Sequence, residues 1–195
     1  MYQKTGTRQR IAGSVSKRLQ PGAQADPLPS RGIAPRDEID HVIEQWGRER
    51  PDLDVSPVAV IGRISRISRS FERAMEGTFK RYGLTSASFY VLAALRRSGP
   101  PYRMSPTQLH SALLVSGGTM THRIDRLEAA GLVMRRGDPL DGRGTLVLLT
   151  GTGRALADRV IEAHNQNEHK LLHSLSAAER EELAHLLRKL LEEWA

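Results

Sequence analysis

The stretch SPTQLHSALLVSGGTMTHRIDRLEAAGLVMRRGDPLDGRGTLVLLT, residues 105–150, has the most specific pattern in the chain. Ser105 followed by Pro106 is typical of a helix N-cap and the first helical residue, and predicts a short helix. Ser116 is expected to cap a second helix that ends at Gly131. Two short apolar runs, LVMRR and TLVLL, then flank the turn-forming cluster GDPLDGRG. The pattern therefore predicts helix, turn, helix and a two-stranded β-ribbon.

The second of these helices has two chemically different faces. At about 100° per residue, Met120, Ile124 and Leu127 fall on one narrow side, which we expect to pack inward. The other side gathers small, polar and basic residues that can bind phosphate or hydrogen-bond to base edges. Together with the N-terminus of the preceding helix and the ribbon, this predicts a DNA-binding surface made of Ser105, Thr107, Ser116, Gly118, Thr119, Thr121, His122, Arg123, Arg126 and Arg143.

The ribbon is expected to project Arg143 beyond the fold at a tight turn. The minor groove of DNA is narrow and strongly negative, so it is a natural destination for such a side chain. Asp141 could orient the guanidinium or cap the turn. The alternative is that Arg143 is an ordinary solvated turn residue.

Bulk composition narrows the possible functions. A chain of 195 residues without cysteine can bury a core, but it has no disulfide, thiolate zinc site or cysteine nucleophile. The net charge of +7 is a poor guide to nucleic-acid binding, because residues 1–36 hold seven cations against one acid. No apolar run approaches the ~18 residues that span a bilayer, so we expect a cytoplasmic protein without membrane contact.

The pattern predicts a mainly α-helical fold in three parts. Residues 1–35 are too poor in large apolar groups to offset their ordering entropy, and are expected to be a disordered basic tail, either passive or tethering DNA nonspecifically. Residues 36–57 are expected to form an additional helix and a loop. Residues 58–195 are expected to be the main domain, with the winged helix-turn-helix at about 84–150 between dimerisation helices at about 58–82 and 151–195. In the last region, Ser176 and Glu179 form a capping-box pattern.

The chain resembles the MarR family of winged-helix transcription regulators from about Asp37 to the C-terminus. SPTQLHSALLVSGGTMTHRIDRLEAAGLV matches the family's helix-turn-helix, and RRGDPLDGRGTLVLLTGTGRAL matches its wing and following helix. The resemblance implies a homodimer whose two recognition helices enter successive major grooves of a pseudo-palindromic operator. It also implies a regulator, usually a repressor, that a small molecule releases from DNA. One departure is His122, where relatives usually have asparagine.

IEQWGRERPDLDVSP and RSGPPYR make the chain similar to the urate-responsive, PecS- and HucR-like subgroup. That resemblance places Trp46, Tyr90 and Arg135 in a ligand pocket, with Tyr90 where the subgroup has an aspartate. Tyrosine carries no charge at neutral pH, so we expect a small aromatic or carboxylate ligand rather than urate itself. Two alternatives remain: the aromatic residues belong to the core or the dimer interface and no ligand binds, or urate binds despite Tyr90.

Other functional classes have weaker support. No nucleophile elbow, phosphate-cradling loop or metal signature accompanies the serines, histidines and aspartates, so neither an enzyme nor a cofactor is expected. His164, His169 and His173 are interpreted as solvated histidines on a dimer helix rather than as metal ligands. A module that binds a foreign partner is a further alternative, but apolar faces at both ends of the domain fit homodimerisation better.

Overall fold

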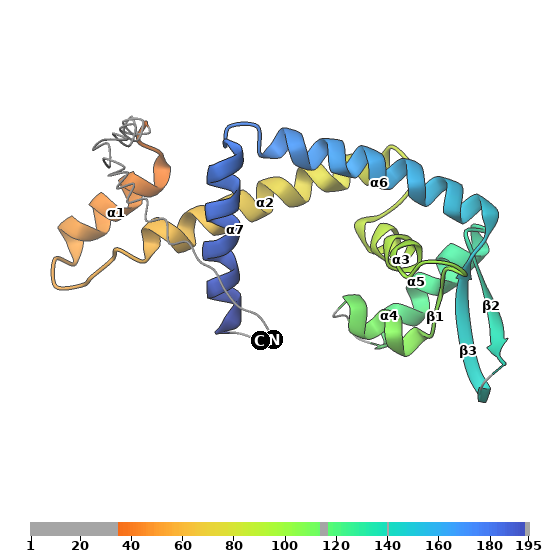
Figure 1. Cartoon of the computed structure of the whole chain (residues 1–195). Coiled ribbons are helices and arrows are strands. Elements are labelled where there is room, and N and C mark those ends of the chain that lie inside the picture. Colours follow the sequence, from red (N-terminus) through yellow and green to blue (C-terminus); the bar gives the residue numbers. More distant parts are fainter. Residues whose placement is uncertain (1–34, 114–116, 140, 194–195) are drawn as a thin grey trace, which may run out of the picture. The chain divides into compact units, whose positions relative to one another are not determined.

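The computed structural model describes residues 35–113, 117–139 and 141–193, and it confirms the predicted mainly α-helical fold with a small β-ribbon (Figure 1). The helices and strands of these residues follow one another in the order α1 (Glu38–Glu49), α2 (Val58–Lys80), α3 (Ser86–Arg97), β1 (Arg103–Met104), α4 (Pro106–Leu113), α5 (Gly117–Ala129), β2 (Val133–Asp138), β3 (Asp141–Leu149), α6 (Gly151–Leu171) and α7 (Ala177–Glu192). The predicted disordered tail and the Ser116 cap lie outside the described residues. The described helices include none long and apolar enough to cross a membrane.

Side-chain caps define several helix starts. The Thr85 hydroxyl accepts a hydrogen bond from the Ser88 amide at 3.1 Å at the start of α3. At the start of α4, the Ser105 hydroxyl accepts from the Gln108 amide at 3.1 Å, and the Gln108 side chain accepts from the Ser105 amide at 2.8 Å. The predicted Ser176–Glu179 capping box is present at the start of α7. The region expected to hold dimerisation helices at about 151–195 contains two helices, α6 and α7, and α6 ends at Leu171.

The sheet has three antiparallel strands in the order β1-β3-β2. The predicted ribbon is the β2–β3 pair, which runs from Val133 opposite Leu149 to Gly137 opposite Thr145 and then becomes irregular. The expectation that Arg143 lies in the turn at the tip of the ribbon is wrong for the backbone, because β3 begins at Asp141. The last pair of the ladder is Asp138 opposite Asp141, so both ends of the GDPLDGRG segment belong to the ribbon.

The core lies around α3, which contacts α2, α4, α5, α6 and β3. The expected inward face of α5 is confirmed, since Met120, Ile124 and Leu127 are each at most 2% exposed. These side chains pack with apolar residues of the other elements, including Phe79, Phe89, Leu92, Leu95, Leu109, Val133, Val147 and Val160. The close packing of this core therefore determines which side of α5 faces outward.

One junction joins the end of α5, the wing and α6. The Thr150 amide donates to the Leu132 carbonyl at 3.1 Å, and the Thr150 hydroxyl donates to the Gly131 carbonyl at 2.8 Å. The same hydroxyl oxygen accepts from the Gly153 amide at 2.9 Å and so caps α6. Gly153 approaches so closely that a Cβ there would lie 1.8 Å from the Leu132 carbonyl oxygen.

Two long apolar surfaces remain uncovered within the protomer. Helices α2 and α6 run side by side (Figure 1), but the N-terminal half of α2 exposes Val60, Ile61, Ile64 and Ile67. Helix α7 has no buried residue and exposes Leu183, Leu186, Leu187, Leu190 and Leu191. Helix α1 contacts α2 through Ile39, which lies against Gly62, and through the ion pair of Asp40 with Arg63 at 2.8 Å.

Candidate functional site

The outward face of α5 is polar, basic and accessible. Thr119, Thr121, His122 and Arg126 are exposed, and Arg123 is half-buried at the edge of this face. In the described part of the chain, neither Arg123 nor Arg126 forms an ion pair with a carboxylate. Both guanidinium groups therefore remain available for an anionic partner.

The other expected DNA contacts divide into three groups. Ser105 is half-buried because its hydroxyl caps α4, whereas Thr107 is exposed in the first turn of that helix. Gly118 lies in the first turn of α5, where backbone N–H groups lack intrahelical acceptors. The Arg143 backbone belongs to β3, and its side chain and Ser116 lie outside the described residues.

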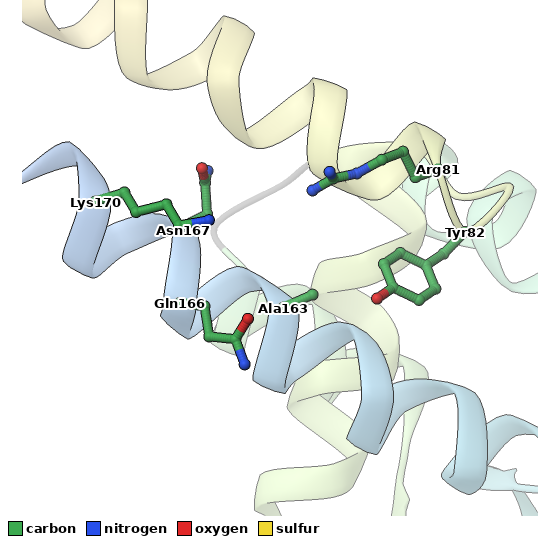
Figure 2. A pocket seen from close by; sticks show the side chains of 6 residues that line it. All are labelled: Arg81, Tyr82, Ala163, Gln166, Asn167 and Lys170. Carbon is green, nitrogen blue, oxygen red and sulfur yellow. The ribbon is translucent and has the colours of Figure 1, made fainter.

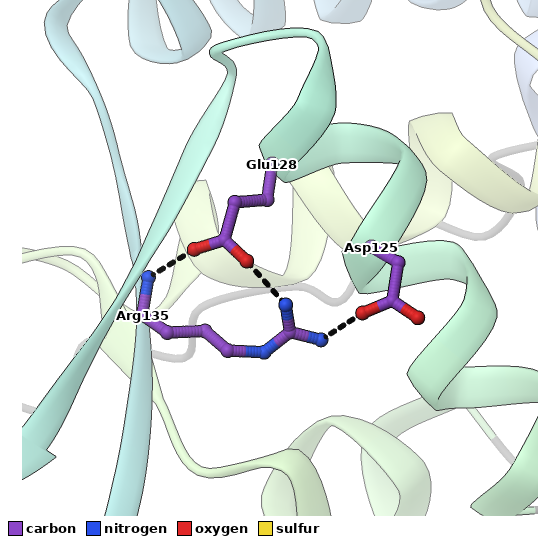
Figure 3. Close-up of polar contacts among 3 residues, drawn as sticks. All are labelled: Asp125, Glu128 and Arg135. Carbon is purple, nitrogen blue, oxygen red and sulfur yellow. Dashed lines mark hydrogen bonds and ion pairs between the residues drawn. The ribbon is translucent and has the colours of Figure 1, made fainter.

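Arg135 on β2 joins the wing to α5 (Figure 3). Its guanidinium donates to the carboxylates of Glu128 and Asp125, and its backbone amide donates to the same Glu128 at 2.8 Å. Burial lowers the pKa of Arg135, but the hydrogen bonds to Asp125 and Glu128 outweigh it and the pKa is raised. The side chain is therefore a permanent cation held between two acids of α5.

This arrangement decides the net charge of α5. Asp125 and Glu128 are the two acidic residues of α5, and Arg135 binds both. Without that cation, their negative charge would oppose the approach of phosphates to Arg123 and Arg126. Arg135 thus positions the wing against α5 and also neutralises the acids beside its basic face.

Replacing Arg135 with glutamine is expected to destabilise the protein by about 1 kcal/mol, because the ion pairs are partly exposed and screened by solvent. Operator affinity should fall by about tenfold or more, since two unpaired carboxylates would then lie near the DNA. Urea denaturation and gel-shift titration measure the two effects. Arg136→Gln is the matched control for stability, because the neighbouring Arg136 is exposed and has no ion pair in the described residues. Equal losses of stability in both variants would contradict the proposed role of Arg135.

A groove of about 590 Å³ lies between α3, the end of α4 and α5, and Tyr90 lines it. Arg97 and Arg123 supply two cations to its wall, and the remaining lining residues are small or apolar: Ser86, Ala87, Ala112 and Leu113. An adjoining hollow of about 600 Å³ shares Ala87 and Arg123 and extends over Thr119, His122, Asp125 and Arg126. The groove therefore meets the expected DNA-binding face at Arg123.

Tyr90, which lines the groove, also belongs to an aromatic cluster. Its ring centroid lies 5.4 Å from that of Phe89 and 6.1 Å from that of Phe79. Burial raises the pKa of the Tyr90 phenol, and the negative charges of Glu168 and Glu72 raise it further. Tyr90 is therefore a neutral hydroxyl donor at neutral pH, as its side-chain chemistry predicts.

The interpretation of His164 as a solvated histidine is wrong. Its side chain is 14% exposed, and its ring packs 5.2 Å from Phe79 and 5.0 Å from Phe89. Glu168 lies one helical turn away, 3.2 Å from His164 Nε2. His169 and His173, by contrast, are exposed. The fold brings α6 against the aromatic end of α3, which helical spacing alone does not reveal.

The three expected ligand-pocket residues are not gathered in one groove of the protomer. Tyr90 lines the groove beside α5, whereas Arg135 binds Asp125 and Glu128, and Trp46 is half-exposed on α1. Neither Trp46 nor Arg135 lines that groove. Sequence reasoning missed Arg97, a wall residue whose only signal was a basic pair at the end of α3.

Comparisons with known proteins identify the family. The model of the MarR family matches residues 82–144. The HTH-type transcriptional regulator PecS of Dickeya dadantii is 43% identical over 150 residues, which cover 77% of this chain and 90% of PecS. The chain belongs to the MarR family. The expectation of a transcription regulator rather than an enzyme is thereby confirmed for this family member.

Two solved MarR family structures resemble this member over most of their length. A mutant MarR from Escherichia coli, complexed with operator DNA, has a TM-score of 0.62 and 30% sequence identity. The match covers 71% of this chain and 99% of the MarR chain. BpsR of Bordetella bronchiseptica, whose DNA binding is regulated by 6-hydroxynicotinic acid, has a TM-score of 0.60 and 32% identity. That match covers 67% of this chain and 91% of BpsR.

Proposed function

We propose that this MarR family member is a homodimeric, ligand-responsive transcriptional repressor. It binds a pseudo-palindromic operator and acts in the cytoplasm. The observation that carries the proposal is the division of α5 into a buried apolar side and an outward side with exposed Arg126 and half-buried Arg123, neither of which pairs with an acid of the described chain. A helix of this kind, standing out from a helix-turn-helix and flanked by a wing, suits the major groove. The relatives are regulators of transcription, and one neighbour is bound to operator DNA.

The proposed contacts follow the chemistry of each side chain. Thr119, His122, Arg123 and Arg126 face the base edges and phosphates of the major groove. Ser105 and Thr107 at the start of α4, Gly118 and Thr121 on α5, and Ser116, which precedes α5 in the sequence, hold the phosphate backbone. Arg143 enters the minor groove beside the wing, where the negative potential is concentrated. Because relatives usually have asparagine in place of His122, the base that this side chain prefers has to be measured.

Replacing Arg126 or Arg143 with alanine is expected to cost about 1–3 kcal/mol of operator affinity each, because each change removes a charged contact with DNA. The dimer should remain folded, since Arg126 is exposed and the Arg143 change leaves the β3 backbone in place. Gel-shift titration on a selected operator fragment measures the loss, and Arg159→Ala on the exposed side of α6 is the control. Unchanged affinity in the Arg126 variant would remove the recognition helix from the mechanism; unchanged affinity in the Arg143 variant would remove only the wing.

The uncovered apolar surfaces of α2 and α7 support the homodimer. Long leucine- and isoleucine-rich helix faces are seldom left in water, and a second copy offers the same faces in return. A dimer also supplies the two recognition helices that a palindromic operator requires. The dimer is therefore part of the proposed DNA-binding mechanism.

The groove beside α5 is the proposed site for a small aromatic acid. Tyr90 offers a ring and a hydroxyl donor, and Arg97 and Arg123 offer charge to a carboxylate. A ligand there would draw Arg123 away from DNA and would favour a protein state that fits the operator poorly. The regulation of BpsR by 6-hydroxynicotinic acid, an aromatic acid, supports this ligand class. The pocket roles of Trp46 and Arg135 stay predictions.

Replacing Arg97 with glutamine is expected to weaken aromatic-acid binding about tenfold, because one charge-assisted hydrogen bond to the ligand is lost. Operator affinity without ligand should be unchanged. Calorimetric titration with 6-hydroxynicotinate, benzoate and urate measures the binding, with Arg159→Gln as the control. Tight, specific binding of urate alone would reverse the ranking of ligands. No binding of any of these compounds would favour a regulator that acts without such a ligand.

A further inference from the structure

A second hollow, of about 440 Å³, lies between the end of α2 and the middle of α6 (Figure 2). It is lined by Arg81, Tyr82, Ala163, Gln166, Asn167 and Lys170. None of these residues lines the groove beside α5, and none belongs to the proposed DNA-binding face. The hollow is therefore a separate feature of the protomer.

The wall of this hollow carries two cations and no acid. Figure 2 shows the side chains of Arg81 and Lys170 directed toward the space between α2 and α6. Neither side chain forms an ion pair with any of the described residues, and the polar contact of Arg81 is a long one, 3.4 Å to the Thr78 hydroxyl. Two positive charges thus share one concave site without a counter-charge from the described chain.

Asn167, which also lines the hollow, has a buried side-chain donor without an acceptor. The Asn167 Nδ2 atom is buried and has no hydrogen-bond partner among the described residues. A buried amide nitrogen without an acceptor costs free energy, and a water or an ion is the partner that would relieve this cost. Gln166 and the Tyr82 hydroxyl supply further donors at the rim.

We infer that this hollow binds a small anion of the phosphate class, held by Arg81, Lys170 and Asn167. Two unpaired cations balance the charge of a phosphate dianion, and its tetrahedral oxygens accept more hydrogen bonds than a carboxylate does. The volume admits a phosphate ester as well as free phosphate. Arg81 ends α2 and Lys170 lies in the last turn of α6, so the anion would cross-link these two helices.

Titration of the full-length protein with inorganic phosphate at constant ionic strength tests the inference. Wild-type protein should bind phosphate saturably, and the side-chain amide signal of Asn167 should shift in nitrogen–proton correlation spectra. Arg81→Gln and Lys170→Gln should each weaken binding about tenfold, as expected for a lost charge-assisted hydrogen bond. Arg69→Gln on the exposed surface of α2 and Arg159→Gln on α6 are the matched controls. Acetate titrated in parallel tests a carboxylate.

Phosphate can also bind at the DNA-facing arginines, so the variants must locate the site. Weaker binding in the Arg81 and Lys170 variants, with unchanged circular dichroism and the Asn167 signal no longer shifting, supports the inference. Equal binding by wild-type protein and both variants would overturn it, as would an Asn167 signal that does not move. Stronger binding of acetate than of phosphate would overturn the assigned ligand class. None of these outcomes depends on operator binding.

Discussion

Replacing Gly153 with alanine should destabilise the protein by about 3 kcal/mol, at the upper end of the cost of overpacking. The new Cβ would lie 1.8 Å from the Leu132 carbonyl oxygen, and backbone cannot move aside as a flexible side chain does. Displacing that carbonyl also breaks its hydrogen bond with the Thr150 amide, 3.1 Å in length. Thermal and urea denaturation should show the loss, and a smaller amount of soluble protein is expected at 37 °C.

Gly151→Ala is the matched control for this prediction. Gly151 begins α6 only two residues earlier, but a Cβ there meets nothing within 4 Å. Alanine has the higher helix propensity and reduces the freedom of the unfolded chain, so this variant should be neutral or slightly more stable. Similar stabilities of the two variants would contradict the close approach of α6 to Leu132.

Replacing Leu190 with glutamate should dissociate the proposed dimer and lower operator affinity about 100-fold or more. The side chain is half-exposed in the protomer, and it lies on the helix face that carries the other leucines of α7. A symmetric interface would bury two such carboxylates, and each buried charge costs several kcal/mol. Separate protomers would then bind one half-site at a time.

His185→Glu adds the same charge on the opposite side of α7, because the two positions differ by about 140° around the helix axis. This control variant should remain dimeric and bind the operator normally. Light scattering after size-exclusion chromatography, followed by gel-shift titration, distinguishes the two variants. A Leu190→Glu variant that remains a dimer would show that this face of α7 lies outside the interface.

Local sequence signals predicted most of the fold because they act over a few residues. The caps at Ser105 and Ser176 need only a polar side chain three residues from an amide, and both are present. The inward face of α5 follows from helical periodicity. Strand β1 was missed because its two residues are a strand only through pairing with β3, with Arg103 opposite Leu148.

The site was harder to predict because it depends on neighbours distant in sequence. The resemblance to the urate-responsive subgroup implied a ligand-pocket role for Arg135, and the fold adds that its side chain binds the two acids of α5. His164 looked solvated because its partners, Phe79 and Phe89, lie more than 70 positions away. Arg97 had no motif to mark it, since its role depends on the position of the end of α4 across the groove.

The junction at Thr150 makes α6 a lever. Hydrogen bonds from Thr150 and the close contact of Gly153 fasten the N-terminal end of α6 to the turn that follows the recognition helix. The 21 residues of α6 extend about 30 Å from that joint. A tilt of about 4° at the distant end would therefore displace the recognition helix by about 2 Å. Two such levers in a dimer would respond to a slight change in helix crossing with a large change in the distance between half-sites.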